Sequence, residues 1–285
     1  LTKVGAPAAD LERVSSALAK AQDRHTESLK GGASASEAFQ QSLRVIAPIA
    51  TGLAAGLVAF GTTSVKAFEE SEIAIAQLEN VIRSTGGVAG VTAKEVLEMS
   101  AAIQKSTGIS DEAATTAQSM LLSFTKIGKD VFPDVTRAVT DMATFMNKGA
   151  VPSMAQLSQT AIQIGKAMQD PVQGVSALQR VGVRLSESQK ELVKDLVAMG
   201  DTAGAQRVIL KELQTEFGGA AEAAGKTFRG QVKIAREEMN DFQEDVGSKI
   251  VPVLQGLMQD FPDAAKGAIF LGDSIGSLNI RAGDL

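Results

Sequence analysis

Apolar positions recur every three or four residues along most of this chain, and few stretches alternate between apolar and polar residues. A repeat of three to four residues places apolar side chains on one face of an α-helix, whereas strict alternation indicates a β-strand. The pattern therefore predicts an all-α protein. We expect a compact bundle of short helices, flanked by long amphipathic, coiled-coil-like helices and by one apolar helix. The predicted segments are 1–44 (amphipathic helices), 45–67 (apolar helix), 68–217 (compact multi-helix module), 218–262 (long amphipathic helix) and 263–285 (a tail segment leading out of the fragment).

The first predicted helix covers residues 8–30 and has an apolar seam with alternating spacings of three and four residues, which is typical of a coiled coil. Gly31 and Gly32 end this helix, and a second helix is expected from about Ser36 to Arg83. The seam of the first helix consists of Leu11, Val14, Leu18, Ala21 and His25.

The second helix contains an uncharged run of 21 residues, Val45–Val65, between Arg44 and Lys66. As a helix the run would extend for about 30 Å, the thickness of the hydrocarbon layer of a bilayer. Gly52 and Gly56 are four residues apart, a spacing that lets two helices approach closely. Two interpretations remain open, a latent membrane segment that inserts at a later stage or a helix buried in an oligomer. The residues expected to contact a membrane or another helix are Val45, Ile49, Gly52, Leu53, Gly56, Leu57 and Phe60.

Residues 91–217 contain regularly spaced helix start and stop signals, which predict six or seven short helices. Two capping boxes are present, in which a Ser or Thr precedes a Glu or Gln by three residues. An Asp directly before a Pro, and glycines just before further capping residues, mark other boundaries. These signals are Thr92–Glu95, Gly108 with Ser110, Asp170 with Pro171, Ser186–Gln189 and Gly200 with Asp201.

A long amphipathic helix is predicted after Gly218 and Gly219, with Pro252 and Pro262 limiting its extent. Its apolar positions follow a heptad seam with one four-residue stutter near Gly247. The seam predicts either self-association or the packing of a single helix on a globular core. Its residues are Val232, Ala235, Met239, Phe242, Val246, Ile250, Val253 and Leu257.

Composition narrows the class of protein. Apolar residues make up 44% of the 285 residues but aromatic residues only 4%, so the core buries little area per residue and we expect oligomerisation to help stabilise it. The net charge of −5, without any block of Lys or Arg, argues against sequence-independent binding of nucleic acid. The absence of Cys excludes disulfides, thiol catalysis and thiolate metal sites.

The sequence contains few residues suited to catalysis. His25 is the only histidine, and neither a phosphate-binding loop nor an H-E-x-x-H motif occurs. We interpret His25 as a seam residue that fixes helix register, with a ring of His25 side chains holding an anion or a metal as the alternative. We predict no catalytic, cofactor-binding or metal-binding residues, and hence no enzyme. Neighbouring carboxylates are interpreted as solvated helix faces, namely Glu69–Glu70, Glu237–Glu238 and Asp241 with Glu244 and Asp245.

Three stretches carry a resemblance to a known family. They include STGGVAGVTAKEVLEMS, GKAMQDPVQGVSALQRVGVRL and GDTAGAQRVILKELQTEFGG, within the ranges Ser84–Phe124, Ile164–Lys190 and Gly200–Ala224. In this order they resemble the tail tape measure proteins of long-tailed bacteriophages, so we expect the chain to be an internal or terminal fragment of such a protein.

The resemblance implies a virion protein in the lumen of the tail tube, present in several copies and expected to be a trimer. Such a protein sets tail length while tube subunits polymerise around it, and it is ejected at infection to help the genome cross the host envelope. The implied partners are tail tube and tail tip or baseplate proteins, tail assembly chaperones and, after ejection, the host membrane. Residues 84–219 differ from an extended ruler because they form short helices. The alternative function is that of a membrane-active, pore-forming protein or toxin.

Overall fold

The computed structural model describes residues 61 and 63–260. Within these residues every regular element is an α-helix and none is a strand, which confirms the all-α class. Residues Ser64–Val253 form one compact unit. The predicted helix over 8–30, His25 and nearly all of the uncharged run lie outside the described residues.

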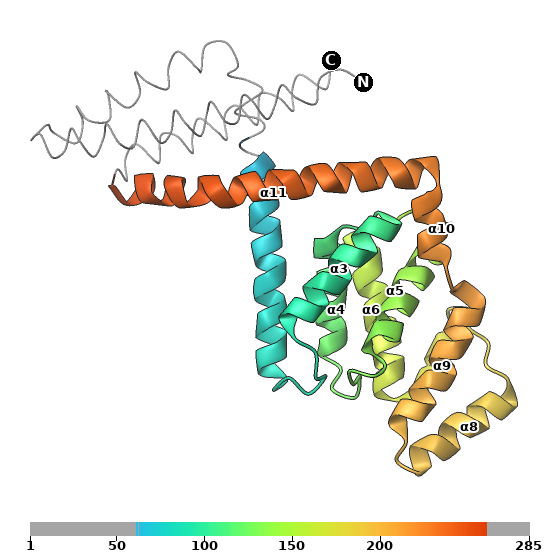
Figure 1. Ribbon diagram of the computed structural model, residues 1–285. Helices are drawn as coiled ribbons and strands as arrows, with labels where there is room; N and C mark the ends of the chain where they lie inside the picture. Colours follow the sequence, from blue (N-terminus) through green and yellow to red (C-terminus); the bar gives the residue numbers. More distant parts are fainter. Residues whose placement is uncertain (1–60, 62, 261–285) are drawn as a thin grey trace, which may run out of the picture. The chain divides into compact units, whose positions relative to one another are not determined.

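The first described helix covers 63–84 and ends in a turn over 85–89. The helices that follow are drawn in Figure 1. They are α3 (Ala93–Thr107), α4 (Asp111–Leu122), α5 (Phe132–Met146), α6 (Met154–Gln169), α7 (Pro171–Gln179), α8 (Glu187–Ala198), α9 (Thr202–Phe217), α10 (Ala220–Lys226) and α11 (Phe228–Asp260).

The boundaries of the short helices follow the predicted capping signals. The Thr92 amide donates to the Glu95 carboxylate at 2.8 Å, and the Glu95 amide donates to the Thr92 hydroxyl at 3.2 Å, so this capping box is confirmed. The predicted caps at Ser110, Asp170 and Ser186 are confirmed as well. Seven helices, α3 to α9, lie between residues 91 and 217, as the signals predict.

The centre of the unit is α6, which packs against α4, α5 and α7. Two glycines of this region allow close packing. The Phe124 ring covers Gly165 of α6, and Gly174 of α7 lies against the backbone of Ala167, so any larger residue at either glycine would collide with its neighbour. The largest fully buried side chains include Leu121, Phe132, Met142, Leu157, Ile164, Met168, Ile209 and Leu213.

Two predictions about the long helix are wrong in detail. The chain is not continuously helical after Gly219, because α10 ends and α11 begins at Thr227. The Thr227 hydroxyl accepts a hydrogen bond from the Gly230 amide at 3.0 Å and so caps the new helix. Pro252 does not end α11, which continues to Asp260. A proline inside a helix removes one backbone hydrogen bond, and the remaining bonds of α11 maintain the helix through that position.

Candidate functional site

The predicted seam of α11 lies partly on the surface. Val232 is 45% exposed, Met239 is 48% exposed, and Ala235 and Phe242 are also exposed. We call these four residues the outer stripe. Phe228, at the start of α11, is 87% exposed and extends the apolar surface.

Two further residues of the predicted seam are less exposed to solvent. Val246 and Ile250 are half-buried. The side chains of Val253 and Leu257 are beyond the residues whose burial is described. The role of the whole seam in oligomerisation therefore stays a prediction.

The opposite face of α11 faces the other helices. It carries polar side chains and glycines together with the half-buried Ile234, which lies against Gly108. Gly230, Glu237 and Gly247 are buried, whereas Asp241 and Glu244 point at groups of other helices. We call these five residues the inner stripe. An amphipathic helix on a globular protein normally buries its apolar face. In α11, by contrast, Val232, Met239 and Phe242 are exposed whereas Glu237 is buried.

Glycines make the close contacts of α11. Gly225, at the end of α10, lies against the backbone of Ser106, and Gly230 lies against the backbone of Ala224 and Gly225. We call this meeting of α3, α10 and α11 the elbow. Further along α11, Gly247 lies against the Ser64 carbonyl in the helix over 63–84. Figure 1 shows α11 crossing that helix.

A group of carboxylates lies where α11 meets α4. The carboxylate oxygens of Asp111, Glu112 and Glu244 lie within 4.8 Å of one another. The buried Gln104 side chain of α3 donates to Asp111 at 3.2 Å and to Asp241 at 2.9 Å. We call these four acids the carboxylate group.

Three acids of the carboxylate group, Asp111, Glu112 and Glu244, have pKa values above their ordinary range. Burial and the neighbouring charge of Asp111 raise the pKa of Glu112 to about 7. Burial and the charge of Asp241 raise the pKa of Asp111. Burial also raises the pKa of Glu244, although a hydrogen bond with Ser71 opposes the rise. Near neutral pH the carboxylate group therefore carries less than its full negative charge.

Sequence reasoning missed this group. The interpretation of the α11 carboxylates as solvated is wrong for Glu237, which is 2% exposed and paired with Lys233 and Asn240. It is also wrong for Glu244, which is half-buried, while Glu238 and Asp245 are exposed as predicted. The spacing of Glu237, Asp241 and Glu244 on one helix face was a visible signal. Glu237 is buried and Glu244 half-buried, while the exposed Asp241 accepts a hydrogen bond from Gln104, which is 137 residues away in the sequence.

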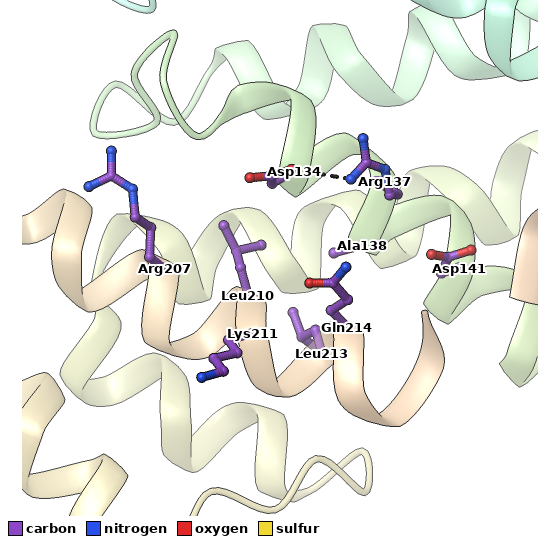
Figure 2. A pocket seen from close by; sticks show the side chains of 9 residues that line it. All are labelled: Asp134, Arg137, Ala138, Asp141, Arg207, Leu210, Lys211, Leu213 and Gln214. Atoms are coloured by element: carbon purple, nitrogen blue, oxygen red, sulfur yellow. Dashed lines mark hydrogen bonds and ion pairs between the residues drawn. The ribbon is translucent and has the colours of Figure 1, made fainter. Parts of the chain in front are cut away.

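A hollow of about 130 Å³ lies between α5 and α9 and is drawn in Figure 2. It is smaller than a typical pocket for an organic ligand. Asp134 and Arg137 pair with each other at its rim, at 3.4 Å. Asp141 accepts hydrogen bonds from the amides of Gly219 and Ala221, so its carboxylate positions the start of α10. The acids of this hollow therefore have structural partners already.

The residues predicted to contact a membrane lie outside the described residues. These are Val45, Ile49, Gly52, Leu53, Gly56, Leu57 and Phe60. Among residues 61 and 63–260, no helix combines the length and the apolar character needed to span a bilayer.

The part of the chain that the structure describes is all-helical, and a family comparison shows which class of helical protein it belongs to. Residues 27–194 match the model of the prophage tail length tape measure protein family, and this match covers more than half of the chain. The chain therefore belongs to the tape measure family of phage tail proteins, as the resemblance indicated. No curated protein and no solved structure matches it.

Proposed function

We propose that this chain is part of a protein that lies in the lumen of the tail tube, sets tail length during assembly and leaves the tail at infection. The observation that carries the proposal is the family match over residues 27–194. In this role the protein acts through its length, its surface and its assembly, without catalysis. Tail tube subunits, tail tip or baseplate proteins and tail assembly chaperones are the partners that such a role requires.

We assign different roles to α11 and to the module formed by α3 to α10. A helix converts residue number to length at about 1.5 Å per residue, so the 33 residues of α11 extend for about 50 Å. The helices α3 to α10 have 7 to 16 residues each and fold back on one another, so they add little length. We therefore assign measurement to extended helices such as α11, and a role as a folded terminal or connecting body to the module.

The outer stripe suits contact with further copies of α11. Apolar residues at heptad spacing on an exposed helix face are the pattern of a coiled-coil seam. Two or three parallel copies would cover Val232, Ala235, Met239 and Phe242 of each, and a trimer is the copy number that the family resemblance suggests. A bundle of this kind would be narrow enough to act as a core for tube polymerisation.

Protease protection of purified virions tests the location. A luminal protein is expected to stay intact when protease is added to intact virions, and to become degraded or lost after ejection has been triggered. A surface tail protein is the control and is expected to be cleaved under both conditions. Cleavage of the chain in intact virions would reject a position in the lumen.

We also propose that residues 45–65 assist passage through the host membrane after ejection. The support is the uncharged run with its Gly52 and Gly56 pair. Leakage of a dye from anionic liposomes is expected with the whole chain and is expected to fall for the Gly52→Leu plus Gly56→Leu variant. If neither protein causes leakage at any pH between 5 and 8, the membrane role is wrong, whereas the protease test remains valid.

A further inference from the structure

Basic side chains line the hollow between α5 and α9. Arg207 and Lys211 are four residues apart, so they lie on one face of α9, and both are exposed. Figure 2 shows them beside Leu210, and Arg137 of α5 lines the same hollow. Within the described residues neither Arg207 nor Lys211 forms an ion pair, whereas the acids of the hollow have partners already. The rim of the hollow therefore offers positive charge to a further group.

The floor of the same hollow is apolar. It is lined by Ala138 of α5 and by Leu210 and Leu213 of α9, all of them buried. The volume of about 130 Å³ corresponds to roughly four water molecules, which is the size of one branched aliphatic side chain. We call this floor with its rim cations the basic hollow. Its chemistry fits an acidic helix face from which one apolar side chain protrudes.

The helix over 63–84 presents a face of that kind. Exposed residues recur along it at spacings of three, one, three and three, which keeps them on one side of the helix. Ile73, which is 58% exposed, is the large apolar residue among them. The opposite face of this helix is buried and includes Ala74 and Leu78. We call the exposed residues the acidic face, namely Glu69, Glu72, Ile73, Ala76 and Glu79.

The acidic face and the basic hollow do not meet within one chain. Both belong to the compact unit Ser64–Val253. In Figure 1 the helix over 63–84 and α9 stand on opposite sides of this unit, with α4 and α6 between them. A contact between two different surfaces of identical chains is heterologous, and it closes into a ring when the rotation between copies permits.

We propose that the acidic face of one copy of the chain docks in the basic hollow of the next copy. Ile73 then covers the apolar floor, and the carboxylates of the acidic face pair with the cations of the rim. The occupant is a second copy because its charge and its protruding apolar side chain complement those of the hollow. A ring of three copies would occupy both surfaces of every copy. The contact does not use the outer stripe and does not depend on the tail role.

The size and the charges of the contact set its strength. One helix face against a shallow hollow buries less than about 1,200 Å², so the contact is weak between separate chains. It forms at high local concentration, as in an assembly that other contacts already hold together. Salt screens ion pairs at the rim, so the contact is expected to weaken between about 0.05 M and about 0.5 M salt.

Cysteine cross-linking tests the contact directly, because the chain has no cysteine of its own. Ala76→Cys places a thiol on the acidic face, and Gln214→Cys places one at the hollow, both at exposed positions. The two whole chains carry tags of different mass and are mixed under mild oxidation. We expect the mixed disulfide to exceed both symmetric disulfides by roughly tenfold or more, since a bound pair holds its thiols at high effective concentration. Ala155→Cys, at an exposed position of α6, replaces Ala76→Cys in the control and is expected to give no such excess.

Charge exchange assigns the cross-link to the two surfaces. Arg207→Glu plus Lys211→Glu in the chain labelled at the hollow is expected to lower the yield by roughly tenfold, because like charges then face one another. Glu69→Lys plus Glu72→Lys in the other chain is expected to restore the yield by bringing opposite charges together again.

A second pair of exposed arginines provides the matched control. Arg180→Glu plus Arg184→Glu has the same four-residue spacing outside the hollow and is expected to keep the wild-type yield. Circular dichroism checks that every variant keeps its helical fold. A mixed disulfide no more abundant than in the Ala155→Cys control would overturn the proposal. A yield that charge exchange does not restore would overturn it as well.

Discussion

The module formed by α3 to α10 and the long helix α11, here called the arm, differ in which side chains they bury. In the module, α6 is surrounded by other helices, and Leu157 and Ile164 are fully buried. In the arm, apolar Val232 and Met239 face outward, while Glu237 is buried. The free energy of the module therefore depends on contacts within the chain. The arm leaves the apolar side chains of its outer stripe exposed in the single chain.

The largest loss of stability is expected for a substitution that creates a cavity in the module. Leu157→Ala removes a fully buried side chain from α6 and is expected to lower the free energy of unfolding by about 3 kcal/mol, since it loses both transfer free energy and packing. Chemical denaturation of the whole chain measures this. Leu192→Ala changes an exposed residue of α8 and is expected to cost less than about 0.5 kcal/mol. Equal costs for the two variants would contradict the assignment of the core.

A somewhat smaller effect is expected at the buried acid of Figure 2. Asp141→Ala leaves the amides of Gly219 and Ala221 without their acceptor and is expected to cost about 2 to 3 kcal/mol. Asp134→Ala, on the same helix, removes only an exposed ion pair with Arg137, for which about 0.5 kcal/mol is expected. Both values can be measured by thermal and chemical unfolding. If Asp134→Ala were the more damaging change, Asp141 would not anchor α10.

A local effect is expected where the arm crosses the helix over 63–84. Gly247→Ala adds a methyl group against the Ser64 carbonyl and is expected to weaken this crossing by about 1 to 2 kcal/mol, because neither backbone can move aside easily. Hydrogen exchange is expected to rise in 63–84 and around residue 247, with α4 and α6 unchanged. Gly61→Ala is the control, since no atom lies within 4 Å of the added methyl group. Faster exchange throughout the module would show that the arm is part of the core.

The smallest effect on stability is expected at the outer stripe. Val232→Ser plus Met239→Ser changes exposed residues, so the free energy of unfolding of the monomer is expected to change by less than about 0.5 kcal/mol. Self-association measured by sedimentation equilibrium is nevertheless expected to be lost, because the seam no longer buries apolar side chains. Met199→Ser, at an exposed position directly after α8, is the control and is expected to associate like the wild type. If the wild-type chain stays monomeric at high concentration, the proposed self-association through the outer stripe is wrong.

The sequence was enough to predict the helix boundaries of the module, but it did not show which face of the arm is buried. Capping depends on residues three positions apart, so Thr92 with Glu95 and Ser186 with Gln189 could be recognised locally. The direction of each face of α11 depends on distant residues. Gly225 and Gly230 form the elbow, and Gln104 of α3 donates to Asp241, although the heptad pattern alone could not show which face of α11 meets these groups. The break at Thr227 was hidden because Ala220–Lys226 is itself a good helix former.

The elbow has a mechanical consequence. At Gly225 and Gly230 the backbones of α10 and α11 touch without intervening side chains, and Gly225 also touches the end of α3. Backbone atoms cannot change rotamer as side chains do, so a shift of α11 at the elbow would have to move the start of α11, the end of α3 and α10 together. The elbow therefore fixes the direction in which α11 leaves the module.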